Sequence, residues 1–149
     1  MNENIENWLR RAGPTLDAAL DAPRGLYDRL KYVAEIIRDA GELPSQPHLF
    51  YRGTDNQVHA VLVGQEVAVG REPPSSHVIN DPKLSRRHFC VCIRSESAII
   101  TDLHSRNGTY VNGEKTRERE LCDGDIIEAG SQVLVFLRGD TEAREREME

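Results

Sequence analysis

The sequence has 149 residues, enough for one domain of ordinary size with a modest appendage. Apolar residues make up 38% and charged residues 30%, which is typical of a folded chain and too apolar for a wholly disordered one. The formal net charge of −6 excludes the basic excess that non-specific binding to nucleic acid or to an anionic membrane requires, so anion recognition must come from local clustering of cations.

The N-terminus lacks the basic and apolar regions of a secretory signal, and no run approaches the roughly 20 apolar residues of a membrane span. The three cysteines, Cys90, Cys92 and Cys122, are an odd number without the spacing of a disulfide framework. These features predict a cytoplasmic protein with free thiols.

Residues 1–45 predict a helical N-terminal extension. Its best-defined helix ends at Gly41 and has an apolar stripe formed by Leu26, Leu30, Val33 and Ile37. We expect this stripe to pack on the rest of the protein, because an amphipathic helix must bury its apolar face. A free helix that binds a partner or mediates self-association is the alternative. Thr15 is a candidate phosphorylation site that the same protein could bind, or simply a first-turn residue of a helix.

Residues 46–138 change to short runs rich in β-branched and aromatic residues, separated by turn signals such as Asn107-Gly108 and Asp123-Gly124. Eight runs are predicted as strands: 48–51, 57–63, 66–69, 88–94, 98–101, 109–111, 126–128 and 133–137. Many short strands with this spacing predict a mostly β protein, an antiparallel sandwich or barrel. Residues 139–149 are polar and charged and predict a disordered tail.

Cationic and polar residues gather in the loops between these strands. They are Arg71, Lys83, Arg86, Arg87 and Arg106, with Ser85 and Asn107 among them. Arg86 and Arg87 are neighbours, so we expect only one of them to face a shared ligand. If the loops converge at one end of a sandwich, they form a phosphate site, because a dianionic phosphate favours forked and charge-assisted donors.

Four sequence blocks in this region resemble the signatures of the forkhead-associated (FHA) family. They are Gly70-Arg71, Ser85-Arg86-Arg87-His88, residues 107–113 (NGTYVNG), and residues 121–127 (LCDGDII) followed by Gly130. The similarity covers roughly residues 49–138. It implies an antiparallel sandwich of about eleven strands, with the α-helical extension added, whose apical loops bind phosphothreonine peptides.

The resemblance also implies roles for individual residues. Arg71 would grip the phosphate, Ser85 would contact it through its hydroxyl and backbone amide, and Arg86 would add a further donor. Asn107 would bond the peptide backbone. Lys83 and Arg106 lie where selectivity beyond the phosphothreonine is read, and their charge suggests a preference for acidic residues. The scaffold positions that brace the loops are Gly70, His88, Gly108 and Asn112.

Two other constellations have competing interpretations. Ser85, His88 and Asp102 could form a hydrolytic triad, but the Gly-x-Ser-x-Gly elbow is absent around Ser85. His88, Cys90 and Cys92 could bind zinc, but the C-x2-C spacing is missing, and burial in the core is the favoured interpretation for these residues.

The sequence therefore predicts a phosphothreonine-dependent adaptor in Ser/Thr kinase signalling, without catalytic activity, cofactor or metal. Its expected partners are proteins phosphorylated by a Ser/Thr kinase, with neither nucleic acid nor membrane involved. The alternative is a phosphate-independent assembly subunit that docks partner proteins through the sandwich and the N-terminal helices.

Overall fold

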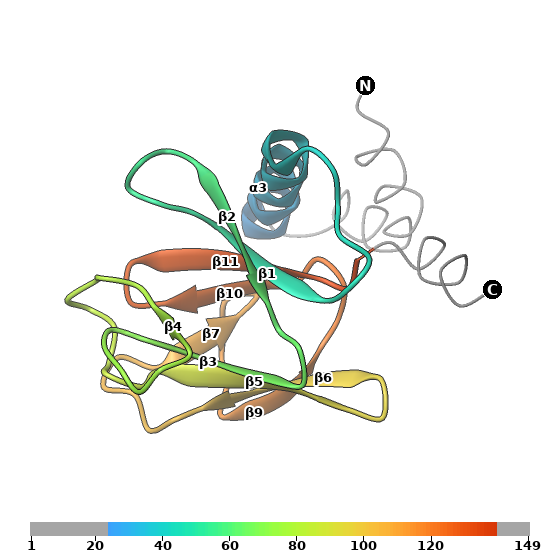
Figure 1. Ribbon diagram of the computed structural model, residues 1–149. Helices are drawn as coiled ribbons and strands as arrows, with labels where there is room; N and C mark the ends of the chain where they lie inside the picture. Colours follow the sequence, from blue (N-terminus) through green and yellow to red (C-terminus); the bar gives the residue numbers. More distant parts are fainter. Residues whose placement is uncertain (1–23, 140–149) are drawn as a thin grey trace.

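A computed structural model of the protein describes residues 24–139 (Figure 1). The predictions for residues 1–23, including Thr15, and for residues 140–149 fall outside the described residues. The described elements are helix α3 (Arg24–Ala40) and the strands β1 (His48–Arg52), β2 (Val58–Leu62), β3 (Glu66–Gly70), β4 (His77–Val78), β5 (Phe89–Arg94), β6 (Ser97–Asp102), β7 (Thr109–Val111), β8 (Glu114–Lys115), β9 (Glu118–Leu121), β10 (Ile126–Ala129) and β11 (Gln132–Leu137).

The strands form two sheets that stack as a sandwich (Figure 1). One sheet has six strands in the order β2-β1-β11-β10-β7-β8, and the other has five in the order β4-β3-β5-β6-β9. Neighbouring strands in these two sheets pair antiparallel except for β3 with β4, which pair in parallel. The predicted mostly β sandwich with eleven strands and an N-terminal helix is confirmed.

The central part of the six-stranded sheet is buried on both faces. Leu49 and Ile127 lie in the core between the two sheets, whereas their chain neighbours Phe50 and Ile126 lie in a second core beneath α3. Successive residues of a strand point to opposite faces, so both kinds of position must be apolar where both faces are covered. This explains why β1, β10 and β11 contain continuous apolar runs rather than a strict alternation.

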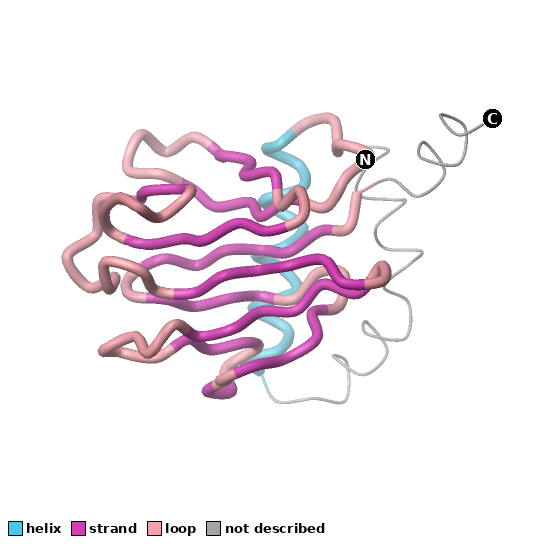
Figure 2. The backbone as a smooth tube through the Cα atoms, turned by 60° about the horizontal axis from the view of Figure 1, so that its bottom comes forward, coloured by secondary structure: helices cyan, strands magenta, loops and turns pink. Residues whose placement is uncertain are grey.

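Helix α3 lies across the strands of this sheet (Figures 1 and 2). Leu30, Val33 and Ile37 of the predicted stripe are buried, and Ile36 beside them is fully buried. The prediction that the stripe packs on the sandwich is confirmed for these three residues, and burial of side chains of this size stabilises by roughly 1.5–3 kcal/mol each. The helix ends at Ala40, and Gly41 follows with a φ of 79°, the left-handed conformation that ends many helices.

All eight predicted strands are present, with each boundary within one residue of its prediction. The three strands that sequence analysis missed are β4, β8 and β9. Two of them have only two residues, and the polar β9 lies at the edge of its sheet. Such segments become strands through backbone pairing with a neighbour, which the local residue pattern does not encode.

The interpretation of Cys90 and Cys92 as core residues is wrong. They alternate along β5 with Phe89 and Val91, which fill the core, so both cysteines lie on the outer face and are partly exposed. Partial burial raises the pKa of the Cys90 thiol. The described residues contain no cluster of His, Cys, Asp or Glu suited to a metal ion. Within residues 24–139, no helix is long and apolar enough to cross a membrane.

A side-chain contact joins the two sheets at one of their edges. The Tyr51 hydroxyl of β1 lies 2.8 Å from Nε2 of His77 in β4, and the Tyr51 ring stacks on His59 of β2. Burial, and secondly the neighbouring His59, lower the pKa of His77 below its ordinary value. The folded protein therefore resists protonation at this site more than the unfolded chain does.

We predict that the burial of His77 makes stability fall in mild acid. Because the pKa of His77 is lower in the folded state, the unfolded chain binds the extra proton as pH falls below about 6.5, and the folding equilibrium shifts toward it. The loss develops between that value and the lower pKa of the folded state. Thermal unfolding of the wild type at pH 7.5 and 5.5 should show a larger loss of Tm than that of His77→Asn. An equal loss in both proteins would contradict the prediction.

Candidate functional site

The loop after β3 is fixed against the loop before β5 by a close backbone approach. A Cβ atom at Gly70 would lie 2.1 Å from the carbonyl oxygen of Arg86, so only glycine fits there. The Arg71 amide donates to the Ser85 carbonyl at 2.9 Å, and the buried Ser75 hydroxyl donates to the Arg86 carbonyl at 2.8 Å. Arg71 is thereby held beside Ser85.

A buried carboxylate shapes the loop that leads to Ser85. Asp81 accepts hydrogen bonds from the Lys83 amide at 2.9 Å, the Ser131 amide at 2.8 Å and the Gln132 side chain at 3.0 Å. Burial by itself raises the pKa of Asp81, but these bonds outweigh it and leave the pKa below its ordinary value. The buried Leu84 then anchors the loop in the core.

His88 joins this loop to the loop between β6 and β7. The ring is fully buried, its Nδ1 accepts the Ser85 amide at 3.0 Å, and its Nε2 lies 2.8 Å from the Gly108 carbonyl. Because the Ser85 amide can only donate, Nδ1 is the acceptor and Nε2 carries the proton donated to Gly108. His88 therefore braces the two loops, as predicted for a scaffold residue.

The β6–β7 loop has its own internal carboxylate. Asp102 accepts from the Ser105 hydroxyl, from the Ser105 amide at 3.1 Å and from the Thr109 hydroxyl at 2.7 Å. Burial by itself raises the pKa of Asp102, but these hydrogen bonds leave it below its ordinary value. The Ser105 hydroxyl also accepts the Gly108 amide at 3.0 Å, so the loop is closed on itself.

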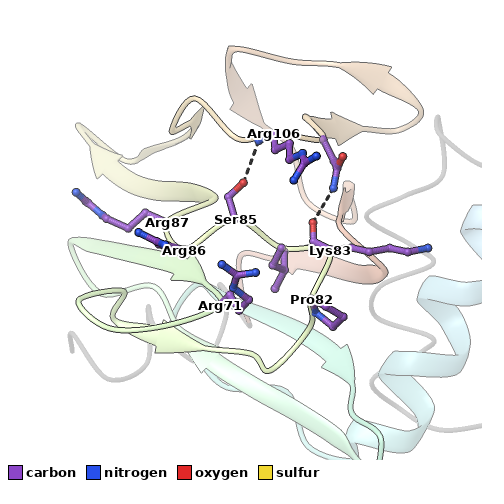
Figure 3. A pocket seen from close by; sticks show the side chains of 9 residues that line it. Arg71, Pro82, Lys83, Ser85, Arg86, Arg87 and Arg106 are labelled. Carbon is purple, nitrogen blue, oxygen red and sulfur yellow. Dashed lines mark hydrogen bonds between the residues drawn. The ribbon is translucent and has the colours of Figure 1, made fainter.

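These loops bring the predicted phosphate-binding, backbone-binding and selectivity residues together around one pocket (Figure 3). The pocket is lined by Arg71, Pro82, Lys83, Leu84, Ser85, Arg86, Arg87, Arg106 and Asn107. Figure 3 shows Arg71 and Arg106 on opposite sides of Ser85. Both Arg86 and Arg87 border the pocket, and the expectation that only one of the two faces a ligand stays a prediction.

Two hydrogen bonds set the positions of the polar groups in the pocket (Figure 3). The Ser85 hydroxyl oxygen accepts the Arg106 amide at 2.9 Å, which leaves its proton to be donated to a ligand. The Asn107 side-chain amide donates to the Lys83 carbonyl at 2.9 Å, which leaves its oxygen as an acceptor. The predicted use of the Ser85 backbone amide toward phosphate does not fit this geometry, because that amide donates to His88.

The electrostatics of the pocket are strongly positive. Five cationic side chains line it, and the lining contains no carboxylate. The carboxylate of Glu72, which follows Arg71, lies 3.4 Å from Nε of Arg86 at the rim. Both partners of this ion pair are largely exposed, so it contributes little to folding. It does offset part of the charge that a ligand would meet.

The hydrolytic triad does not form. Both ring nitrogens of His88 are occupied by backbone groups, and the carboxylate of Asp102 is bound to Ser105 and Thr109. Within the described residues, the Ser85 hydroxyl is hydrogen-bonded to the Arg106 amide and not to His88.

Asn112, the remaining predicted scaffold residue, lies away from the pocket. Its side chain donates to Asp125 at 2.9 Å and accepts the Ile126 amide at 2.9 Å, which fixes the turn that closes the fold.

Sequence analysis missed several residues that build the site from below. Ser75, Asp81 and Ser105 each hold a loop backbone, and Asp102 has this structural role instead of a catalytic one. The available signal was the position of each polar residue next to a loop. Ser75 and Asp81 have partners in a different loop, whereas Ser105 and Asp102 bond within their own loop.

The fold and the site define a β-sandwich recognition module with a cationic pocket in the loops at one end. Residues 67–130 match the model of the FHA domain, and the described sandwich is an FHA domain.

Similar proteins include the oxoglutarate dehydrogenase inhibitor of Corynebacterium jeikeium, 37% identical over 92 residues, which cover 62% of this chain and 64% of that protein. The glycogen accumulation regulator GarA of Mycobacterium tuberculosis is 35% identical over 97 residues, 64% of this chain and 60% of GarA. The chain thus spans about three-fifths of the length of these relatives.

Solved FHA domains have the same fold. A domain described in a structural and functional analysis of phosphothreonine-dependent FHA interactions is 27% identical, with a TM-score of 0.54, over 61% of this chain and 94% of that chain. The FHA domain of the CT664 protein from Chlamydia trachomatis is 26% identical, with a TM-score of 0.56, over 62% of this chain and 97% of that chain.

We predict that Gly70→Ala disrupts the pocket. The added Cβ would overlap the Arg86 carbonyl, so the two loops must separate, at a cost of about 1–3 kcal/mol. Thermal unfolding should show the loss, and amide NMR shifts should change at Arg71, Ser85 and Arg86.

Gly64→Ala is the control, because its φ is 61° but no atom lies within 4 Å of the new Cβ. It should lower stability by about 1 kcal/mol and leave the amide shifts of the pocket unchanged. Wild-type shifts at the pocket in Gly70→Ala would contradict the prediction.

Proposed function

We propose that this protein is a non-catalytic adaptor that binds phosphothreonine-containing proteins in Ser/Thr kinase signalling. The observation that carries this proposal is the convergence of five cations and the Ser85 hydroxyl on one pocket of an FHA domain. We place this activity in the cytoplasm, with phosphorylated proteins as partners rather than nucleic acid or membrane.

In the proposed mode of binding, the phosphate lies between Arg71, Ser85 and Arg86. Arg71 offers a planar fork of donors, which suits the oxygens of a phosphate better than a point charge does. The Ser85 hydroxyl donates its proton, since its oxygen already accepts the Arg106 amide. The site is preformed, because its loops are held by bonds within the protein, so little ordering accompanies binding.

Asn107, Lys83 and Arg106 would read the peptide around the phosphothreonine. The Asn107 oxygen would accept a peptide N–H, while its amide stays on the Lys83 carbonyl. Lys83 and Arg106 are exposed at the pocket and would favour acidic residues beyond the phosphothreonine.

The names of the relatives support a regulatory role. One is an inhibitor of oxoglutarate dehydrogenase and the other a regulator of glycogen accumulation, so both are named for control of metabolism. We infer that this chain also acts by binding to other proteins. A phosphate-independent assembly role gains no support from α3, because its apolar stripe is already buried on the sheet.

We predict that Arg71→Ala reduces affinity for a phosphothreonine peptide at least tenfold. A hydrogen bond to a charged group contributes about 1.5–3 kcal/mol, and about 1.4 kcal/mol corresponds to tenfold. Calorimetric titration of a degenerate peptide set in phosphothreonine, phosphoserine and unphosphorylated forms measures the effect. Binding should be confined to the phosphothreonine form.

Arg94→Ala is the matched control, because Arg94 is exposed at the far end of β5 from the pocket and should leave affinity unchanged. Equal binding of phosphorylated and unphosphorylated peptides would overturn the proposal and favour the phosphate-independent role.

We further predict that Glu72→Gln raises phosphopeptide affinity about twofold to threefold. Arg86 would no longer be paired with a carboxylate, and the repulsion between Glu72 and the phosphate would disappear. Titration at low salt measures the gain. Glu66→Gln makes the same charge change at the opposite end of β3 and should give less. Unchanged or weaker binding by Glu72→Gln would contradict this prediction.

A further inference from the structure

The β6–β7 loop borders a second pocket on its other side. This pocket is lined by Asp102, His104, Ser105, Gly108, Lys115, Thr116 and Arg117. Its lining residues from the loop include Ser105 and Gly108, which directly flank Arg106 and Asn107 of the first pocket. The same loop therefore contributes residues to both pockets and separates one from the other.

Backbone hydrogen bonds hold the segment that carries Lys115 and Arg117 against the β6–β7 loop. The Thr116 amide donates to the Thr109 carbonyl at 2.8 Å, and the Arg117 carbonyl accepts the Asp102 amide at 2.8 Å. These bonds fix Lys115 and Arg117 relative to the β6–β7 loop. The stem of Lys115 lies along Gly108, where a Cβ atom would be 3.0 Å from its Cε.

The charges of Lys115 and Arg117 are not neutralised by ion pairs. Both side chains are exposed, and within residues 24–139 neither forms an ion pair. Glu114 is paired with Arg119 at 3.3 Å. Asp102, the one carboxylate of the lining, is bound within its own loop to Ser105 and Thr109. Two cations and the His104 ring therefore remain to meet a ligand.

We propose that this second pocket binds an anionic group of the same phosphopeptide, either an acidic side chain or a second phosphate. The inference rests on the proposed phosphothreonine function of the first pocket. Each group would be met by ammonium and guanidinium donors, and a phosphate would gain more because it carries more charge and a third oxygen. The protein would thus prefer threonine sites whose flanking sequence is acidic or phosphorylated on the side facing Lys115 and Arg117.

The experiment uses the full chain and a parent phosphothreonine peptide with neutral flanks. Glutamate, and separately phosphoserine, is placed at each position from four before to four after the phosphothreonine. Affinities are measured for the wild type and for the double variant Lys115→Gln, Arg117→Gln. We expect glutamate at one or two adjacent positions to raise affinity about threefold to tenfold, and phosphoserine to raise it further. The double variant should lose these gains and bind the parent peptide as the wild type does.

Arg94→Gln is the charge-matched control and should retain the gains, because Arg94 lies at the opposite end of the sandwich. If the parent peptide binds but no position couples to Lys115 and Arg117, this inference is overturned and the proposed function stands. If the parent peptide does not bind at all, both fall. A gain from phosphoserine alone identifies a second phosphate as the ligand, and equal gains identify a carboxylate as sufficient.

Discussion

The buried ring of His88 is the contact on which the geometry of the pocket depends. One ring nitrogen accepts the Ser85 amide, the other donates to the Gly108 carbonyl, and the two loops that it joins carry most of the pocket lining. A fully buried polar side chain is stable only when its hydrogen bonds are satisfied, and here both are. Two loops far apart in sequence are therefore held in one fixed relation, which a flexible contact between exposed side chains could not achieve.

The same arrangement separates negative charge from positive charge. Asp102 is hydrogen-bonded within its own loop, and Asp81 is hydrogen-bonded to its own loop and to Ser131 and Gln132, while the arginines line the pocket. Clustered cations repel one another and disfavour the compact state. The carboxylates stabilise the loops from beneath without entering the pocket, so the positive field remains available for a ligand. Glu72 is the exception, because its carboxylate pairs with Arg86 at the rim and reduces the positive potential of the pocket.

The sequence predicts those features of the fold and the pocket that neighbouring residues encode, and it does not predict contacts between distant segments. The sandwich, eight strands, the buried stripe of α3 and the residues gathered at the pocket were evident from the residue pattern and the FHA-like blocks. The roles of Ser75 and Asp81 were not, because each bonds a backbone group brought near only by folding. For the same reason the Ser85 amide was assigned to phosphate although His88 occupies it.

The fold also keeps stability and binding in different parts of the molecule. The apolar residues of α3 close the core on the outer face of the six-stranded sheet, whereas the pocket lies in loops at one end of the sandwich. Arg86, Arg106 and Asn107 are exposed and anchor no apolar surface, so their replacement leaves both cores intact. Gly70 and His88 belong to the supporting layer instead, because their replacement moves backbone. A loss of affinity on replacing Arg86, Arg106 or Asn107 therefore measures lost contacts with the ligand. A loss on replacing Gly70 or His88 measures instead a change in the arrangement of the loops.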